Sequence, residues 1–62
     1  MRGFKTKNSI YYVDTVNCLI WGGKLGNSAR RYTVYKMIVG LPGYFEFQDG
    51  GSMTTGIIQK YI

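Results

Sequence analysis

The chain has 62 residues, with eight Lys and Arg against three Asp and Glu, and a net charge of +5. A chain of this length forms one small domain, and a single Cys without any His excludes an internal disulfide and nearly excludes a zinc site. Ten aromatic residues (one Trp, six Tyr, three Phe) provide enough apolar surface for a core, so the composition is not that of a disordered chain.

The first third of the chain predicts a hairpin. Residues 1–8 are basic, and since no apolar segment follows them we do not expect a secretory signal. We expect a flexible N-terminus over these residues, ahead of a single β domain over residues 9–62. Ser9–Val13 and Asn17–Trp21 are short runs of apolar and β-branched residues, and an Asp-led turn separates them. Two such runs around a turn are typical of a β-hairpin.

The middle of the chain begins with a loop and continues with an ambiguous segment. Gly22–Ser28 contains three glycines with Asn and Ser, a composition typical of a loop. Arg30–Val39 fits a helix in having cap residues before it and Gly40 and Pro42 after it. It lacks a helical apolar stripe, however, and is rich in β-branched and aromatic residues, so we favour a long strand.

The last third predicts two strands. Leu41-Pro42-Gly43 fits a type II turn, and Tyr44–Gln48 then alternates, with Phe45 and Phe47 pointing inward. Asp49-Gly50-Gly51 predicts a hairpin turn.

Thr54–Ile62 follows as the final strand, with a bulge or bend at Gly56. The sum is an all-β fold of five short antiparallel strands, which would close into a small SH3-like or OB-like barrel. The alternative is a ββαββ arrangement with Ser28–Val39 helical.

The residues needed for catalysis are missing. General acid–base chemistry uses His or neighbouring carboxylates, but Asp14 and Asp49 fall at predicted turns and Glu46 points outward from a strand. Cys18 has no His to activate it, and the glycines after Trp21 do not match a phosphate-binding loop. We therefore expect no enzyme activity, no catalytic residue, no metal and no cofactor.

One basic and aromatic cluster is the candidate binding site. Strand alternation would place Tyr32, Val34 and Lys36 on one face and Arg31, Thr33 and Tyr35 on the other. Proteins that bind single-stranded nucleic acid combine positive charge with aromatic platforms, whereas exposed Tyr and Arg also anchor protein interfaces. The third interpretation is that the aromatic members belong to the core. The candidate residues are Lys24, Arg30, Arg31, Tyr32, Tyr35 and Lys36.

Several spaced turn and strand residues carry a family resemblance. They are Asn8-Ser9, Tyr12-Val13-Asp14, Gly22-Gly23, Tyr32, Gly40-Leu41-Pro42, Phe45, Asp49-Gly50 and Thr55-Gly56-Ile57. In this pattern the chain resembles very short β-rich proteins of phages and other mobile elements. Such families mostly have no assigned activity, so the resemblance assigns no functional residue. It implies a setting in which small proteins, anti-CRISPR proteins among them, bind and modulate host or defence machinery.

The partner classes follow from charge and setting. A basic balance favours a nucleic acid, a nucleoprotein complex or an acidic protein face. The alternative is a protein inhibitor or adaptor that binds a host or defence enzyme through aromatic and Arg side chains, and a homo-oligomer is a further option. No apolar run approaches the ~20 residues of a membrane helix, and an unpaired Cys agrees with a reducing cytoplasm, so we expect a cytoplasmic protein with no membrane partner.

Overall fold

A computed structural model describes residues 2–62. It is all-β, and the one helical segment in this range is the short 3-10 turn η1, Gly23–Leu25. The strands form an antiparallel sheet of seven in the order β6-β5-β4-β3-β2-β1-β7. They are β1 (Arg2–Lys5), β2 (Ile10–Asp14), β3 (Leu19–Gly22), β4 (Arg30–Lys36), β5 (Pro42–Phe47), β6 (Ser52–Ile57) and β7 (Lys60–Tyr61).

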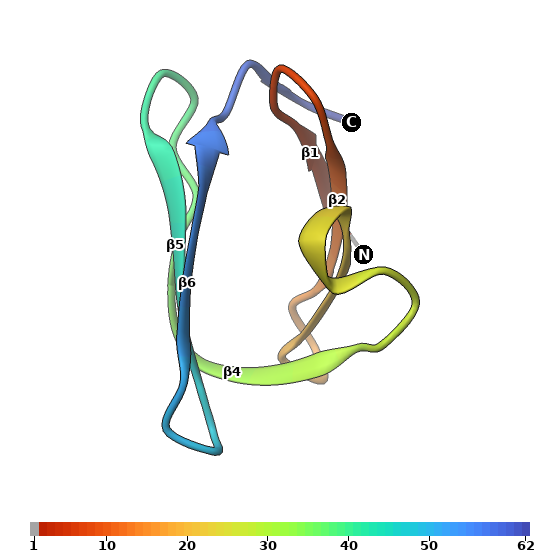
Figure 1. Cartoon of the computed structure of the whole chain (residues 1–62), viewed down its shortest axis with the longest axis vertical. Helices are drawn as coiled ribbons and strands as arrows, with labels where there is room; N and C mark the ends of the chain where they lie inside the picture. The colour runs from red at the N-terminus through yellow and green to blue at the C-terminus, as the bar shows by residue number, and fades with distance from the viewer. Residues whose placement is uncertain (1) are drawn as a thin grey trace.

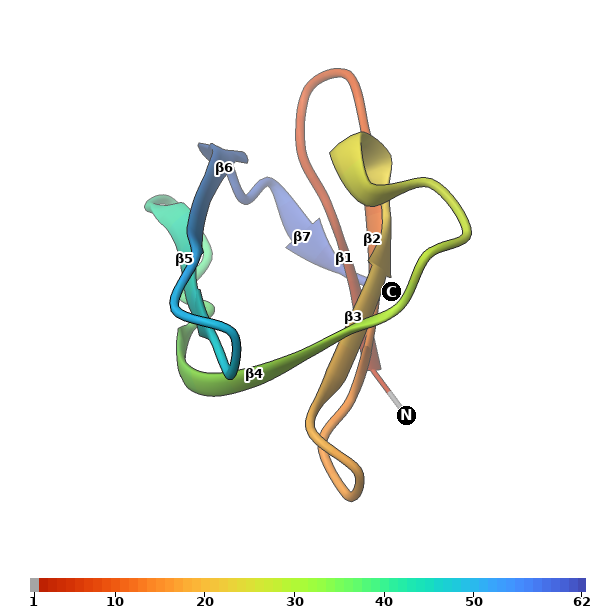
Figure 2. The same cartoon turned by 60° about the horizontal axis from the view of Figure 1, so that its bottom comes forward.

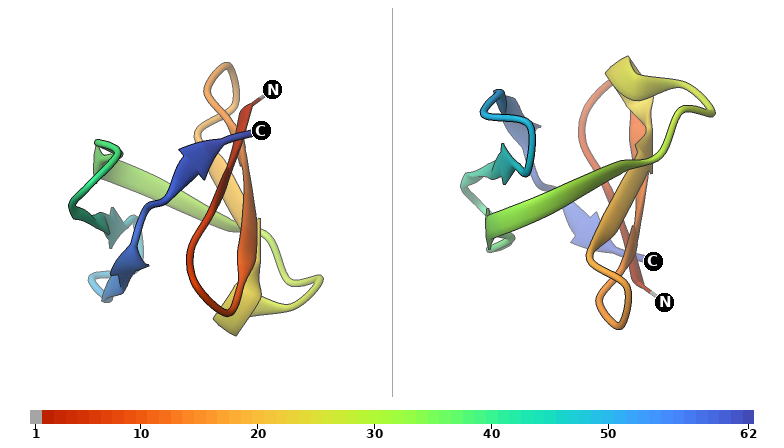
Figure 3. Two further views of the ribbon diagram at one scale, coloured as in Figure 1. Left: turned by 90° about the horizontal axis from the view of Figure 1, so that it is seen from above. Right: turned by 90° about the horizontal axis from the view of Figure 1, so that it is seen from below.

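The sheet curls strongly, so that β5 and β6 face β1 and β2 across the molecule (Figure 1). Strand β4 connects the two halves: it pairs with β3 through Arg30 and Arg31, and with β5 from Tyr32 onward (Figure 3). The edge strands β6 and β7 are consecutive in the chain, and β7 lies against β1 (Figure 2). Between them, Ile58 exchanges backbone hydrogen bonds with Gly40 and Leu41, whereas the Gln59 N–H donates to Lys5 O.

The core lies between the two halves and is mainly aromatic. The ring of Phe4 from β1 stacks on Tyr11 at 5.2 Å and on Phe45 from the opposite half at 6.2 Å. Phe45 also meets Tyr32 edge-on at 5.7 Å. Large rings let a short chain bury enough apolar area to hold two sheet halves together. The buried hydrophobic residues are Phe4, Tyr11, Val13, Ile20, Tyr32, Met37, Phe45, Phe47 and Ile58.

Much of the predicted strand pattern is confirmed. The hairpin of the first third is β2 paired with β3, and the hairpin at Asp49–Gly51 joins β5 to β6. Phe45 and Phe47 both point inward and are buried. The predicted bulge at Gly56 is present, because Thr55 and Gly56 together lie opposite the single residue Gly43.

The strand count and the closure of the barrel were predicted incorrectly. The segment 1–8, expected to be flexible, contains β1, and the ring of Phe4 anchors it in the core (Met1 lies outside the described residues). The final strand is split at Ile58–Gln59, where the chain crosses from β5 to β1. Seven strands therefore replace the predicted five, and the sheet is not closed, since no ladder joins β6 to β7 in residues 2–62. The ββαββ alternative is also wrong, because Arg30–Lys36 is a strand.

Two local predictions are wrong in opposite directions: Gly43, expected in a turn, lies in a strand, and Cys18, expected in a strand, lies in a turn. The turn expected at Leu41–Gly43 lies earlier: the Leu41 N–H donates to Ile38 O, and Gly40 has a φ of 94°. Gly43 belongs to β5, where a Cβ would come within 2.9 Å of Thr55 Oγ1. Cys18, predicted in a strand, lies in the turn before β3 with a φ of 57° and packs against the core.

Candidate binding surface

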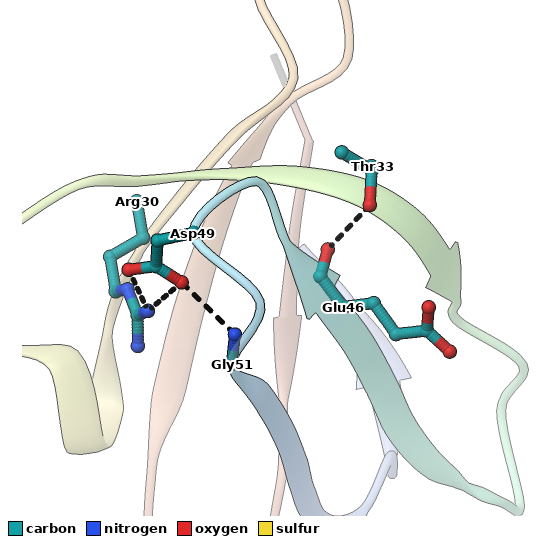
Figure 4. Close-up of polar contacts among 5 residues, drawn as sticks. All are labelled: Arg30, Thr33, Glu46, Asp49 and Gly51. Atoms are coloured by element: carbon teal, nitrogen blue, oxygen red, sulfur yellow. Dashed lines mark hydrogen bonds and ion pairs between the residues drawn. The ribbon is translucent and has the colours of Figure 1, made fainter.

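The arginine end of the predicted cluster is occupied by an ion pair. Nη2 of Arg30 donates to both carboxylate oxygens of Asp49 (Figure 4), at 2.7 and 2.6 Å. The guanidinium also stacks over the ring of Phe47, 3.9 Å from its centroid. The turn after β5 thus places a carboxylate against Arg30 and compensates its charge.

A hollow of about 460 Å³ adjoins this ion pair, lined by Ala29, Arg30, Arg31, Phe47, Gln48 and Asp49. The Gly51 N–H, which donates to Asp49 at 3.1 Å, and the Arg30 guanidinium lower the pKa of the Asp49 carboxyl. Asp49 is therefore ionised at neutral pH. Because a fixed carboxylate repels phosphate, this hollow is a poor site for a polyanion.

The aromatic part of the predicted cluster lies largely in the core. Tyr32 is only 4% exposed, and burial raises the pKa of its hydroxyl. Thr33 is an extra residue in β4 without a residue directly opposite it in β5, so the predicted alternation of faces breaks there. Its hydroxyl donates to Glu46 O at 3.3 Å. Tyr32 and Tyr35 consequently lie on the same face, with their rings 5.3 Å apart, and only Tyr35 is exposed. Tyr32 cannot serve as a platform for a base.

The remaining basic members of the cluster point elsewhere. Lys24 Nζ donates to Thr54 O at 3.3 Å, and Arg31 Nη1 donates to Asn17 O at 3.1 Å. Lys36 lies at the far end of β4 and is exposed. The structure brings Arg30 next to Arg31, and Tyr32 next to Tyr35, but it does not bring the six predicted residues onto one surface.

The glycines before Lys24 are structural. Gly23 lies over the ring of Tyr11, because a Cβ at this position would come within 2.7 Å of Tyr11 Cε2. The Lys24 N–H donates to the Tyr11 hydroxyl at 3.2 Å. Gly22–Gly23 therefore lets the chain cover a buried aromatic side chain, which explains the glycine-rich segment without a ligand.

A different surface gathers exposed and half-buried aromatic and basic side chains: the outer face of β7, β1, β2 and β3. Tyr12 and Trp21 are directly opposite each other on β2 and β3, and their rings stack at 6.0 Å with an interplanar angle of 26°. Gly3 on β1 is the next partner of Tyr12, and Ile62 pairs with Gly3 through two backbone hydrogen bonds. One row is thus Ile62, directly after β7, followed by Gly3, Tyr12 and Trp21 on three strands.

The adjacent row adds positive charge. Lys5 on β1 lies opposite Lys60 on β7 on one side and opposite Ile10 on β2 on the other. Side chains two residues apart on a strand share a face, so Lys5 and Lys60 lie on the same face as Tyr12 and Ile62. We call this surface the lysine–aromatic face. It comprises Lys5, Ile10, Tyr12, Trp21, Lys60 and Ile62.

The lysine–aromatic face is hollowed beside its aromatic row. A shallow depression of about 270 Å³ is lined by Arg2, Gly3, Tyr12 and Ile62. The guanidinium of Arg2 is held 5.2 Å from the centroid of the Tyr61 ring. Gly3 is essential to this arrangement, because a Cβ there would come within 2.8 Å of Ile62 Cγ1.

Acidic side chains are engaged by other groups. Asp14 follows Tyr12 by two residues on β2 and shares its face, but its carboxylate is held by its own turn. Asp14 accepts hydrogen bonds from the backbone of Val16 and from both the backbone and the side chain of Asn17, and these lower its pKa, the Asn17 side chain most. Glu46 accepts from the Tyr44 hydroxyl at 2.7 Å, which raises the pKa of Tyr44. The segments 2–13 and 50–62 contain no acid at all.

Sequence reasoning missed this surface although part of its signal was present. Ile10 and Tyr12 alternate with the buried residues Tyr11 and Val13, which is the pattern of a strand with one solvated face. The decisive neighbours come from β1, which was expected to be flexible, and from β7. The pairing of β1 with β7 is a long-range contact, which local sequence patterns do not predict.

No protein-family model matches the chain, and neither a curated protein nor a solved structure matches it. Among residues 2–62, no group of three or more His, Cys, Asp or Glu side chains is placed to hold a metal ion. The same part of the chain has no helix that is long and apolar enough to cross a bilayer.

Proposed function

We propose that this protein is a non-catalytic cytoplasmic module that binds single-stranded nucleic acid, free or within a nucleoprotein complex, through the lysine–aromatic face. The observation that carries the proposal is the stacked pair Tyr12 and Trp21 on the solvated side of a sheet, one row away from Lys5 and Lys60. Aromatic platforms beside a positive track are how such proteins hold successive bases and the backbone.

The geometry favours single strands over duplexes. Bases in a duplex are stacked on each other, so an aromatic ring on a sheet surface cannot stack on them without unpairing the strands. The +5 net charge attracts either form and gives no preference. The difference between the two affinities therefore reports on Tyr12 and Trp21 specifically.

The test is fluorescence anisotropy with a labelled 12-nucleotide dT strand and a 12-bp duplex at ~50 and ~200 mM salt, since phosphate contacts make affinity fall steeply with salt. Tyr12→Ala should weaken binding of the single strand about 5- to 100-fold, because a stacked base contributes about 1–3 kcal/mol. Tyr35→Ala is the matched control: both tyrosines are exposed, at 39% and 52%, but Tyr35 belongs to the other half of the sheet. No binding of the single strand at low salt would refute the proposal. An equal loss of affinity in both variants would show that the binding site is not confined to the lysine–aromatic face.

A second candidate function, a protein inhibitor or adaptor, is favoured by one observation. The turn between β4 and β5 and the adjacent end of β6 carry four aliphatic side chains that are 44–57% exposed: Ile38, Val39, Leu41 and Ile57. Turns are normally polar, and clustered exposed aliphatic residues are characteristic of contact with another protein. In a phage or mobile-element setting, such a surface would suit a host or defence enzyme.

The two candidates make different predictions in a nuclease-treated pull-down from host lysate. Val39→Asp should abolish recovery of a stoichiometric protein partner. Val16→Asp is the control, because Val16 is 85% exposed in the turn between β2 and β3. Recovery that is unchanged in Val39→Asp would contradict the adaptor candidate, and recovery that disappears with nuclease would favour the nucleic-acid proposal.

A further inference from the structure

The short ladder between β1 and β7 contains a like-charge pair. It joins two residue pairs, Phe4 with Tyr61 and Lys5 with Lys60. Directly opposite residues in an antiparallel ladder have Cβ atoms about 4.5–5.5 Å apart, and like charges in this position are destabilising. The fold thus makes two lysines cross-strand neighbours, and we expect their like charges to repel each other.

The surroundings do not compensate this repulsion. The third residue in the row is Ile10, on the far side of Lys5. Asp14, the one acid on β2, is held by its own turn through Asn17. Among residues 2–62 the one ion pair is Arg30–Asp49, in the turn after β5. Lys7 follows in the same basic segment and adds a further positive charge.

From this juxtaposition we infer that Lys5 and Lys60 form a phosphate site. The inference rests on the proposed function and deepens it: the two lysines hold a backbone phosphate of the strand whose bases stack on Tyr12 and Trp21. Lys5 and Gly3 are two residues apart on β1, so the charged row and the aromatic row are about 6.6–6.8 Å apart. A nucleotide with its phosphate at the lysines can therefore reach the ring of Tyr12.

A phosphate site built on repulsion has a thermodynamic signature. A bound anion removes the repulsion and binds only the folded chain, so it stabilises the protein. Replacing one lysine should then raise stability without ligand and weaken binding of the anion. A lysine that serves the fold would change both quantities in the same direction, so the opposite signs identify a binding role.

The experiment uses the full chain and two probes, sodium tripolyphosphate and the 12-nucleotide dT strand. Thermal unfolding is recorded with each probe and with NaCl at matched ionic strength, for the unmodified chain, Lys60→Gln and Lys36→Gln. Lys36 is the control because it is also exposed, but it lies opposite Tyr44 and has no lysine as cross-strand partner.

Lys60→Gln should raise Tm in the absence of probe, and tripolyphosphate should stabilise it less than the unmodified chain. Its affinity for the dT strand should fall about 5- to 10-fold, and the slope of log affinity against log salt should fall by about 0.7, the value for one contact to a single strand. Lys36→Gln should change none of these quantities.

The outcomes separate the inference from the proposed function. If Lys60→Gln behaves like Lys36→Gln while Tyr12→Ala still weakens binding of the dT strand, the phosphate site is wrong and the nucleic-acid function stands. If tripolyphosphate stabilises the chain through Lys60 but the dT strand does not bind, the phosphate site stands, its ligand is a free polyphosphate, and the nucleic-acid function is wrong.

Discussion

Two regions of this small molecule carry paired positive groups, and they differ in what surrounds them. Arg30, with Arg31 beside it, lies against Asp49, which contacts it at 2.6 Å, and stacks over Phe47. Lys5 and Lys60 lie opposite each other with no acid in their row. The first arrangement serves the fold, since it joins β4 to the turn after β5. Like charges directly opposite each other in a ladder are destabilising, so we expect the second arrangement to cost stability and to favour a bound anion.

The comparison also explains why the arginines are the weaker candidate. A carboxylate that is already paired must be displaced before a phosphate can bind, and the bound phosphate then repels it. At the lysine pair a phosphate replaces repulsion with attraction. Basic residues that carry the same charge therefore differ in how readily they bind a phosphate. The nearest side chain decides this, because a paired carboxylate must first be displaced.

The largest expected effect is a loss of stability at Gly23, next to β3, compared with Gly50 in the Asp49 turn. Gly23→Ala should reduce the free energy of unfolding by about 2–5 kcal/mol, because the new Cβ would overlap the Tyr11 ring and the positive φ of this residue disfavours a side chain. Urea unfolding followed by Trp21 fluorescence measures this loss.

Gly50→Ala is the matched control in the Asp49 turn. Gly50 also has a positive φ, of 96°, but a Cβ there meets no atom within 4 Å. It should therefore lose only about 1–2 kcal/mol, the backbone part of the effect. Equal losses in the two variants would show that the close packing of Gly23 on Tyr11 adds nothing to stability beyond the backbone effect.

Local patterns were sufficient for the strands whose neighbours in the sheet are also neighbours in sequence. The alternation around Phe45 and Phe47, the Asp49–Gly51 turn and the bulge at Gly56 all depend on a few adjacent residues, and all are present. The failures have a different origin. Gly43 has the sequence of a turn, but it lies in β5, where its N–H donates to the Thr55 hydroxyl at 2.9 Å, twelve residues further along the chain.

The candidate surface depends even more on distant contacts. Lys5 and Lys60 are far apart in sequence and become neighbours only because Ile58–Gln59 carries the chain from β5 to β1. Thr33, the bulged residue of β4, rotates the following residues and turns Tyr35 to the side of Tyr32. Neither event has a local signal, which is why the predicted cluster on β4 was not assembled and the lysine–aromatic face was not found.

The second prediction concerns a substitution that gives the lysine pair a carboxylate neighbour, as the Arg30 region already has. Ile10→Glu places a carboxylate directly opposite Lys5, as Asp49 stands beside Arg30. Affinity for the dT strand should fall about 10-fold, equal to about 1.4 kcal/mol, and stabilisation by tripolyphosphate should disappear. The matched control is Ile57→Glu, an exposed residue on β6 in the other half. Unchanged binding in Ile10→Glu would contradict the view that a lysine binds phosphate only when no carboxylate lies opposite it.

A smaller effect is expected on the stability of the chain without ligand when one basic residue of each region is replaced. Lys60→Gln should stabilise the chain by a few tenths of a kcal/mol, because it removes an exposed repulsion that solvent partly screens. Arg30→Gln should destabilise it, since Asp49 loses its partner and Phe47 loses a stacked cation. Both differences should shrink at ~1 M NaCl, where the screening length is about 3 Å. The same sign for both variants would contradict the distinction.

The smallest effect is the dependence of stability on acid pH, which the carboxylates should produce. Hydrogen bonds lower the pKa of Asp49, chiefly from the Gly51 backbone and then from Arg30, and the pKa of Asp14, chiefly from the Asn17 side chain. A lowered pKa means that the folded state holds the proton more weakly than the unfolded chain, whose Asp pKa is about 3.9. The stability that these carboxylates add is therefore fully present above about pH 4–5 and is lost as the pH falls through their folded pKa values.

Asp49→Asn should make this loss of stability in acid shallower in thermal unfolding between pH 2 and 5. Lys60→Gln should leave the shape of the loss unchanged, because among residues 2–62 no carboxylate pairs with Lys5 or Lys60. A shallower acid loss in Lys60→Gln would reveal a carboxylate partner for Lys60 and would remove the reason to place a phosphate there.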